Sequence, residues 1–176
     1  IKERAKRILF VGRLIDRKGI LELAAAFEQL RRDHPEWALT IIGNGPHDAV
    51  LEERDGIELY PFSQPERVAE LMNDSRVLAL PSREEHWGVV VHEAALCGCS
   101  LLLTEAVGAG VDIVGASNGE CVQQTDVAHL KKALKRFYSL APDDWAKAEA
   151  ESLDLSEAFG PQRWAEELQD ILNYYE

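Results

Sequence analysis

Short runs of apolar residues recur along this chain, and a segment with helical spacing follows nearly every one of them. The first run, residues 8–12, reads Ile-Leu-Phe-Val-Gly, and residues 20–32 then place apolar side chains three and four positions apart. Runs that do not alternate with polar residues are typical of strands buried on both faces. Their regular alternation with helices predicts a parallel sheet joined by right-handed crossovers. We therefore expect an α/β fold: a Rossmann-like, doubly wound parallel sheet of about six strands, with helices on both faces.

The other expected elements follow the same pattern. Further strands are predicted at residues 38–43, 57–62, 76–80 and 100–104, with a short sixth strand after Asn118-Gly119. Further helices are predicted at residues 47–54, 65–73, 87–97, 126–140, 142–152 and 161–175. A length of 176 residues, 46% of them hydrophobic, suits one soluble domain over residues 1–176.

The net charge and the positions of the basic residues indicate which class of ligand the chain binds. A formal net charge of −12 argues against nucleic acid, because proteins that bind it usually carry positive charge to meet the phosphates. Basic residues nevertheless gather at residues 2–7 and again at Arg13, Arg17 and Lys18. An anionic small molecule is therefore a candidate ligand.

Cysteine and histidine positions do not indicate a metal site. Cys97, Cys99 and Cys121 are odd in number, and neither they nor the five histidines have metal-ligand spacing, so we expect reduced thiols and no metal. No signal peptide precedes the first strand, and no apolar run approaches the roughly 18–20 residues that span a bilayer, which predicts a cytoplasmic protein. The charged residues that lead abruptly into the first strand suggest that an N-terminal domain is missing from this sequence.

The loops after the predicted strands are the informative positions, because ligands of open parallel sheets bind outside the carboxyl ends of the strands. After the first strand, Gly12 permits a sharp turn. Arg13 and Lys18 then place two cations beside the N-terminus of the next helix, which itself favours anions. This arrangement suits a diphosphate, since arginine grips paired oxygens and lysine supplies a mobile charge. A solvated basic loop is the alternative.

The loop after the fourth strand carries two glutamates, Glu85 and Glu93. A carboxylate such as Glu93 within an apolar stretch is costly to bury unpaired, so it is expected to face a cleft or a ligand. Gly88 and Val89 begin its helix, and their free amides suit a phosphate oxygen. Glu93 could accept hydrogen bonds from two ribose hydroxyls and Glu85 could accept one from a sugar hydroxyl, while His86 adjoins Glu85 in the same loop. Capping and surface charge are the alternative for both glutamates.

Two other interpretations of these loops are less favoured. Gly43-Asn44-Gly45-Pro46 lacks the third glycine of a dinucleotide fingerprint and follows the second strand, so it is interpreted as a turn and NAD is not expected. Paired glutamates also serve hydrolytic acid/base chemistry, but their sequence spacing gives no spatial separation from which to assign it.

Taken in order, these segments resemble the C-terminal, donor-binding domain of family 4 retaining glycosyltransferases, which have the two-domain GT-B fold. The motifs are Phe-Val-Gly-Arg-Leu at 10–14 with Arg-Lys-Gly at 17–19, Ile-Gly-Asn-Gly-Pro at 42–46, Leu-Pro-Ser at 80–82, and the segment 85–98. The resemblance covers nearly the whole chain. Trp87 stands where many relatives have phenylalanine, Cys99-Ser100 replaces a frequent proline, and residues 108–114 match the family's glycine-rich loop only loosely.

The resemblance implies a substrate-binding set of Gly12, Arg13, Lys18, Glu85, His86, Trp87, Gly88, Val89, Val90 and Glu93. Within it, Arg13 and Lys18 would bind the donor diphosphate and Glu93 the ribose. Glu85 would bind the transferred sugar, and the amides of residues 88–90 the distal phosphate. Glu85, Arg13 and Lys18 are the catalytic residues so implied. No metal cofactor is expected, because the cations stabilise the leaving group.

The resemblance also implies the reaction and its partners. The expected function is the donor half of an enzyme that transfers a sugar from a nucleotide-diphosphate sugar with retention, in polysaccharide or glycolipid synthesis. A glycan or lipid-linked acceptor would bind the N-terminal domain, so the isolated domain should be inactive, and the full protein should contact the inner face of the membrane peripherally. The alternatives are a non-catalytic nucleotide-sugar-binding module and a GT-B epimerase. A phosphorylase would need a pyridoxal phosphate lysine motif, which this sequence lacks.

Overall fold

The structure is a computed structural model that describes residues 4–174. Its described strands form one parallel sheet in the order β3-β2-β1-β4-β5-β6. The strands are β1 (Ala5–Val11), β2 (Ala38–Ile42), β3 (Ile57–Tyr60), β4 (Ser75–Leu80), β5 (Ser100–Thr104) and β6 (Gly119–Val122). The predicted α/β class and the six strands are confirmed.

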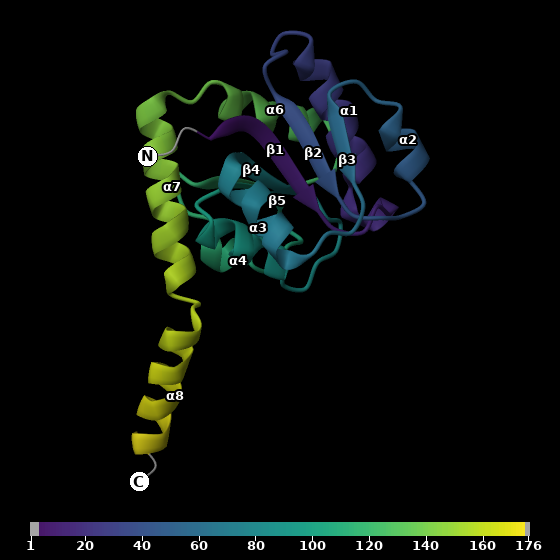
Figure 1. Cartoon of the computed structure of the whole chain (residues 1–176). Coiled ribbons are helices and arrows are strands. Elements are labelled where there is room, and N and C mark those ends of the chain that lie inside the picture. Colours follow the sequence, from purple (N-terminus) through teal and green to yellow (C-terminus); the bar gives the residue numbers. More distant parts are fainter. Residues whose placement is uncertain (1–3, 175–176) are drawn as a thin grey trace.

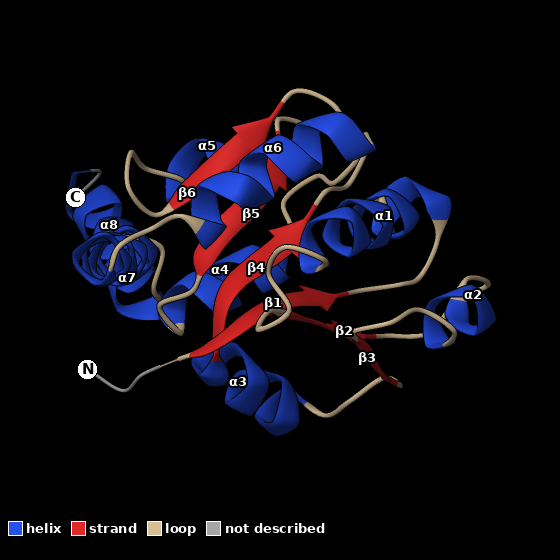
Figure 2. Ribbon diagram, turned by 90° about the horizontal axis from the view of Figure 1, so that it is seen from above, coloured by secondary structure: helices blue, strands red, loops and turns tan. Residues whose placement is uncertain are grey.

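Helices cover both faces of this sheet (Figures 1 and 2). They are α1 (Ile20–Arg31), α2 (Asp48–Glu52), α3 (Pro65–Asp74), α4 (Val89–Leu96), α5 (Gly110–Ile113), α6 (Val127–Tyr138), α7 (Pro142–Glu157) and α8 (Pro161–Tyr174), with a 3-10 turn η1 (Asp16–Lys18). α1 and α6 pack together on one face, and α3 and α4 lie on the other, where α7 packs on α4.

The core lies around the central strands because these are the most apolar segments of the chain. Ile8, Leu9 and Phe10 of β1 are fully buried. All five residues of β5 (Ser100–Thr104) are also buried. α1 adds Leu23 and Phe27 from its inner face. This rigid sheet fixes the positions of the loops at its edges.

Several element boundaries differ from those expected from the sequence. The helix predicted at 87–97 begins two residues later, because Gly88 adopts a left-handed φ of 88° at its N-cap. The helix predicted at 142–152 runs on to Glu157, and α8 continues beyond the body of the molecule (Figure 1). The short α5 and η1 were not predicted, and residue 175, the predicted end of the last helix, lies outside the described residues.

The strand order reverses beside β1. From β1 the chain moves outward through β2 to β3, and it then returns to place β4 on the other side of β1. Loops at the carboxyl ends of β1 and β4 leave in opposite directions at such a point, which opens a crevice between them. The fold therefore predicts a ligand site at these two loops.

Candidate functional site

The loops after β1 and β4 are in direct contact at this edge. Gly19, between η1 and α1, has a φ of 66°, and a Cβ atom there would lie 2.3 Å from the carbonyl oxygen of Pro81. Only a glycine both tolerates this backbone conformation and allows the close approach. The contact brings Lys18, the residue before Gly19, next to the loop that follows β4.

Lys18 and Glu85 form an ion pair between these two loops. Their side chains are 14% and 21% exposed, so the pair is partly shielded from water. An ion pair in this setting is screened less than one on an open surface. The structure thus brings together two of the three predicted catalytic residues.

A third loop, after β5, supports Glu85. The Glu85 amide donates to the carbonyl of Ala106 at 3.2 Å, and the amide of Gly108 donates to the carbonyl of Glu85 at 3.1 Å. A Cβ atom at Gly108 would lie 2.0 Å from the carbonyl oxygen of His86, so this position also requires glycine. The loop after β5 therefore holds the Glu85 backbone in place.

A cavity of about 840 Å³ opens at the carboxyl ends of β1 and β2, with α3 and α4 as walls. It is lined by Val11, Gly12, Arg13, Ile42, Gly43, Asn44, Phe62, Ser63, Pro65, Val68, Ala69, Met72, Val90, Glu93, Leu96 and Cys97. Arg13 and Glu93 are both exposed, and neither side chain has a hydrogen-bond or ion-pair partner among the described residues. Both charges can therefore serve a ligand in the cavity.

The N-terminus of α4 lies between the ion pair and the cavity. Gly88 is buried, and a Cβ atom there would touch the Glu85 side chain at 3.3 Å, while Val90 and Glu93 line the cavity. The first amides of a helix have no partner within it, so Val89 and Val90 present donors at this junction. An anion that touches both Lys18 and the cavity would meet these amides.

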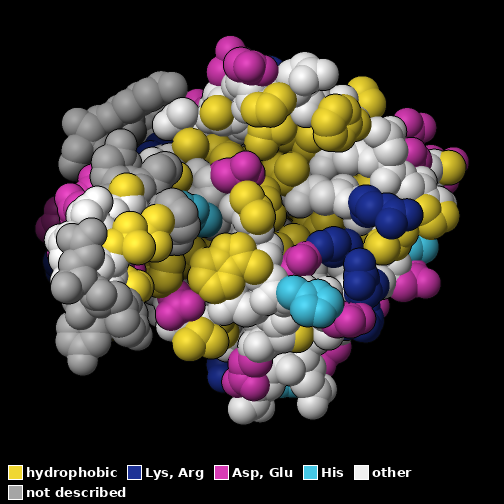
Figure 3. All heavy atoms as spheres, turned by 90° about the horizontal axis from the view of Figure 1, so that it is seen from below, with side chains coloured by type: hydrophobic (Ala, Val, Ile, Leu, Met, Phe, Trp, Pro, Cys, Tyr) yellow, Lys and Arg dark blue, Asp and Glu magenta, His cyan; other side chains and the backbone are white. Residues whose placement is uncertain are grey.

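His86 and Trp87 lie at the exposed margin of the site. His86 is exposed, and Trp87 is 37% exposed, with its ring 6.0 Å from that of Phe159 beyond α7. Seen from below, Lys and Arg side chains gather beside a histidine and acidic side chains, next to a face rich in exposed hydrophobic side chains (Figure 3). The structure places both residues near Glu85 in the chain but assigns neither a contact with Lys18 or Glu93.

Sequence reasoning missed part of the cavity wall. Gly43 and Asn44 were interpreted as a turn, yet both line the cavity, and the Asn44 side-chain oxygen accepts a hydrogen bond from the Phe62 amide at 2.8 Å. Their position directly after β2 was the available signal. The α3 residues Val68 and Met72 carried no such signal, because nothing in their spacing distinguishes them from ordinary core positions.

Cys97 lines the cavity, but its thiol is not activated. Burial raises the pKa of Cys97, and the nearby Glu93 carboxylate adds to this, against the opposing charge of Arg4. A raised pKa keeps the thiol protonated at neutral pH, whereas a nucleophile needs the thiolate. In the described part of the chain, no three His, Cys, Asp or Glu side chains converge as a metal site would require.

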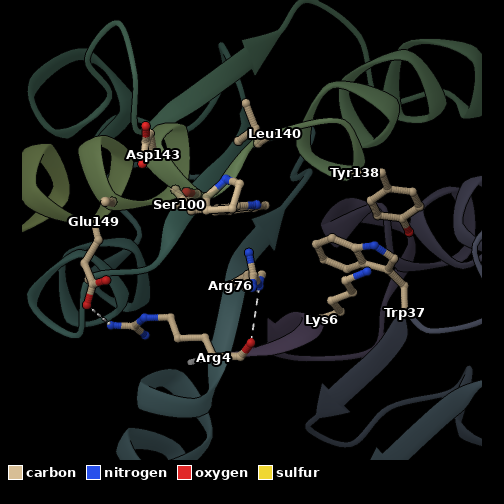
Figure 4. A pocket seen from close by; sticks show the side chains of 13 residues that line it. Arg4, Lys6, Trp37, Arg76, Ser100, Tyr138, Leu140, Asp143 and Glu149 are labelled. Atoms are coloured by element: carbon tan, nitrogen blue, oxygen red, sulfur yellow. Dashed lines mark hydrogen bonds and ion pairs between the residues drawn. The ribbon is translucent and has the colours of Figure 1, made fainter. Parts of the chain in front are cut away.

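A second cavity, of about 620 Å³, lies at the opposite, amino ends of β1, β4 and β5 (Figure 4). The Arg4 guanidinium in its wall donates to the Cys97 carbonyl at 2.6 Å and pairs with Glu149 at 2.8 Å. Lys6 pairs with Glu36 at 3.1 Å. Ligands of open parallel sheets bind at the carboxyl ends of the strands, so we assign these paired cations at the amino ends a structural role and place the functional site at the opposite edge.

The fold and the strand-end loops define a GT-B-type α/β domain, and comparison with known proteins identifies its family. Residues 1–152 match the family described as Glycosyl transferases group 1, and the chain belongs to this family. It is 31% identical over 137 residues to the glycogen synthase of Mycobacterium tuberculosis, covering 73% of this chain and 33% of that protein. The chain thus spans about a third of the length of that relative.

Solved structures share the fold. The sucrose-phosphate synthase from Thermosynechococcus elongatus superposes with a TM-score of 0.81 at 22% identity, over 96% of this chain and 45% of that one. The C-terminal domain of a group 1 glycosyl transferase, LpcC from Francisella tularensis, gives a TM-score of 0.74 at 20% identity, over 89% of this chain and 87% of that one. No described helix of the present chain is both long and apolar enough to traverse a bilayer.

Proposed function

We propose that this chain is the C-terminal, donor-binding domain of a family 4 retaining glycosyltransferase, and that it binds a nucleotide-diphosphate sugar. The observation that carries the proposal is the junction of the Lys18–Glu85 pair with the cavity that contains Arg13 and Glu93. Two cations, two carboxylates and the first amides of α4 lie in or beside the loops at the switch point of the sheet, where an α/β fold binds its ligand.

The role proposed for each group follows from its chemistry. Arg13 and Lys18 bind the diphosphate, and they stabilise the negative charge that grows on it as the sugar leaves. The amides of Val89 and Val90 bind the distal phosphate, as helix N-termini commonly do. No metal is needed in this scheme, since the cations supply the positive charge.

The carboxylates recognise the sugars. Glu93, on the cavity wall one turn into α4, accepts hydrogen bonds from the ribose hydroxyls. Glu85, next to Lys18, accepts a hydrogen bond from the transferred sugar. His86, Trp87 and the Gly12 turn border the same space in this proposal.

The chain covers only a third of its glycogen synthase relative, so the reaction is proposed for a longer protein. We propose that a further, N-terminal domain supplies the acceptor site for a glycan or lipid-linked acceptor, and that this chain alone binds donor without transferring it. Cytoplasmic location with peripheral membrane contact is part of the proposal. A flotation assay that finds the complete protein wholly soluble would count against the membrane contact.

The test is calorimetric titration of the chain with UDP, GDP, ADP and their sugars, with NAD as the control and with and without EDTA. We expect saturable, EDTA-insensitive binding of one nucleotide. Arg13→Ala, Lys18→Ala and Glu93→Ala should each weaken it by about 1.5–3 kcal/mol, roughly ten- to a hundred-fold, because each removes a charged hydrogen bond.

Arg17→Ala is the matched control for these variants. Arg17 is in the same loop, 49% exposed, and its side chain pairs at 3.7 Å with Glu84 rather than with Glu85. Its loss should leave nucleotide affinity nearly unchanged. Unchanged affinity in all three site variants, in protein that remains folded, would overturn the proposal.

A further inference from the structure

The side chain of Arg83, in the loop after β4, reaches across to the loop that carries Lys18. Its Nη1 donates to the Asp16 carbonyl at 2.7 Å, and its Nη2 donates to the carboxylate of Glu22, in the first turn of α1, at 2.6 Å. Its backbone amide donates to the Arg17 carbonyl at 2.8 Å. Arg83 therefore binds the chain immediately before Lys18 through two carbonyls and the helix after it through a carboxylate.

A third loop joins the same junction. Arg83 Nη2 lies 3.4 Å from the carbonyl oxygen of Thr125, in the segment after β6, and the Thr125 hydroxyl donates to the Pro81 carbonyl at 3.0 Å. A Cβ atom at Gly19 would lie 2.3 Å from both the Pro81 oxygen and the Thr125 methyl group. The backbone on each side of Lys18 is thus held against residues 81–83 and 125.

We propose that Arg83 is a positioning residue that fixes the Lys18 loop and so holds the Lys18 ammonium group against Glu85 at the diphosphate site. The identity of the ligand in this inference rests on the proposed donor-binding function. The placement of Lys18 can be measured without any ligand. Arginine suits the task because its planar fork reaches several acceptors at once, whereas lysine presents a single charged centre.

A purely structural role is the competing explanation, and the chain contains a matched arginine to test it. Arg31, at the end of α1, pairs with Asp55 at 3.0 Å and donates to the carbonyls of Pro35 and Trp37 at 3.1 Å each. Like Arg83, it binds two or more carbonyls and a carboxylate, but it borders neither Lys18 nor the cavity. Arg31→Ala should therefore lower stability without changing the site.

The first measurement is the acetylation rate of each lysine in the chain, read by mass spectrometry. In Arg83→Ala, Lys18 should react about fivefold faster or more, because its loop opens more often, while exposed Lys147 serves as the internal reference. Arg83→Lys should be intermediate, Arg31→Ala should match the unaltered chain, and Glu85→Gln should be fast as a positive control. An unchanged Lys18 rate in Arg83→Ala would overturn the proposal.

The second measurement is the affinity for UDP, GDP or ADP, whichever binds, and for the matching nucleoside. Arg83→Ala should weaken diphosphate binding about tenfold and leave nucleoside binding unchanged, because a displaced cation affects only the phosphates. Equal loss for both ligands would indicate general destabilisation and overturn the positioning role. If no nucleotide binds the unaltered chain but Lys18 reactivity responds as expected, the donor-binding function fails while the role of Arg83 in placing Lys18 stands.

Discussion

Lys18 and Glu85 are joined by an ion pair that spans two loops from different strands, β1 and β4. Each side chain therefore partly neutralises the charge that the other presents to a ligand. A phosphate that approaches Lys18 competes with the Glu85 carboxylate for the same ammonium group. A ligand that carries both a phosphate and a sugar hydroxyl could bind Lys18 through the phosphate and Glu85 through the hydroxyl.

This competition predicts that Glu85→Gln strengthens the binding of a sugar-free nucleoside diphosphate. Removing the carboxylate frees the Lys18 ammonium group to bind the phosphate. The binding free energy of the diphosphate should therefore improve by about 1 kcal/mol, or roughly fivefold in affinity. Calorimetric titration with UDP, GDP and ADP measures the change. Glu84→Gln is the control, because Glu84 is 64% exposed and pairs with Arg17 instead. Weaker binding in Glu85→Gln would contradict the competition.

Glu93 gives a second prediction, which isolates the ribose contact. If Glu93 binds ribose hydroxyls, a 2′-deoxynucleotide should bind the unaltered chain about tenfold more weakly than the ribonucleotide. In Glu93→Ala the two nucleotides should bind equally, since the partner of the hydroxyl is gone. Glu70→Ala, an exposed glutamate on α3, should keep the full difference. A difference that persists in Glu93→Ala would place the ribose elsewhere.

The sequence was sufficient for the strands and for placing Arg13, Lys18 and Glu85 in loops that follow them, for an identifiable reason. Strands buried on both faces leave continuous apolar runs, and the ligand rule for parallel sheets then selects the loops that follow them. The actual partnership of Lys18 with Glu85 was not derivable, because it depends on how two loops from separate strands pack. Arg83 was missed for the same reason: two of its side-chain acceptors are backbone carbonyls, which carry no residue-type signal, and the third is the carboxylate of Glu22 in a separate helix.

The boundary of α7 shows a different limit. The helix was predicted to end at residue 152, but its true stop signal is Gly160-Pro161, and the structure ends the helix at Glu157. Residues 153–157 contain no breaker, so propagation of the helix costs little there. The cavity wall contributed by α3 was equally hidden, since apolar residues that face a cavity have the same spacing as those that face the core.

Gly19 yields a prediction about the contact between the two loops. Gly19→Ala combines a left-handed backbone, which costs a side-chain-bearing residue about 1–2 kcal/mol, with a clash against the Pro81 carbonyl. Urea unfolding should show a loss above 2 kcal/mol, and nucleotide affinity should fall. Gly56→Ala is the control: its φ is 74° and its added Cβ meets the Arg31 side chain, which borders neither Lys18 nor the cavity, so it should lower stability but leave nucleotide affinity unchanged. If the two variants behave alike, the loop contact does not constrain the site.

Glu151 yields a prediction about stability alone. Its carboxylate, on α7, accepts hydrogen bonds from the amides of Ser117 and Asn118 at 2.6 and 2.7 Å, and from that of Ala116 at 3.2 Å. Glu151→Ala leaves these amides without this acceptor and should lower the free energy of unfolding by about 2 kcal/mol. Glu157→Ala, exposed at the end of the same helix, should change it little. Nucleotide affinity should be unaffected in both, as measured by the same titration.

The buried thiol of Cys99 gives a prediction of how the free energy of unfolding depends on pH. Burial raises the pKa of Cys99 to about 12, so the folded chain keeps a proton that the unfolded chain begins to release near pH 8.5. Stability is therefore fully present below that pH and falls as pH rises toward 12, by up to about 1.4 kcal/mol per pH unit for this group. Urea unfolding at pH 8, 9 and 10 measures the slope, and Cys99→Ser removes the titration while a serine hydroxyl retains a donor for the Met72 carbonyl, 3.1 Å from the sulfur. The variant should lose stability less steeply between pH 9 and 10; parallel slopes would show that another group controls this range.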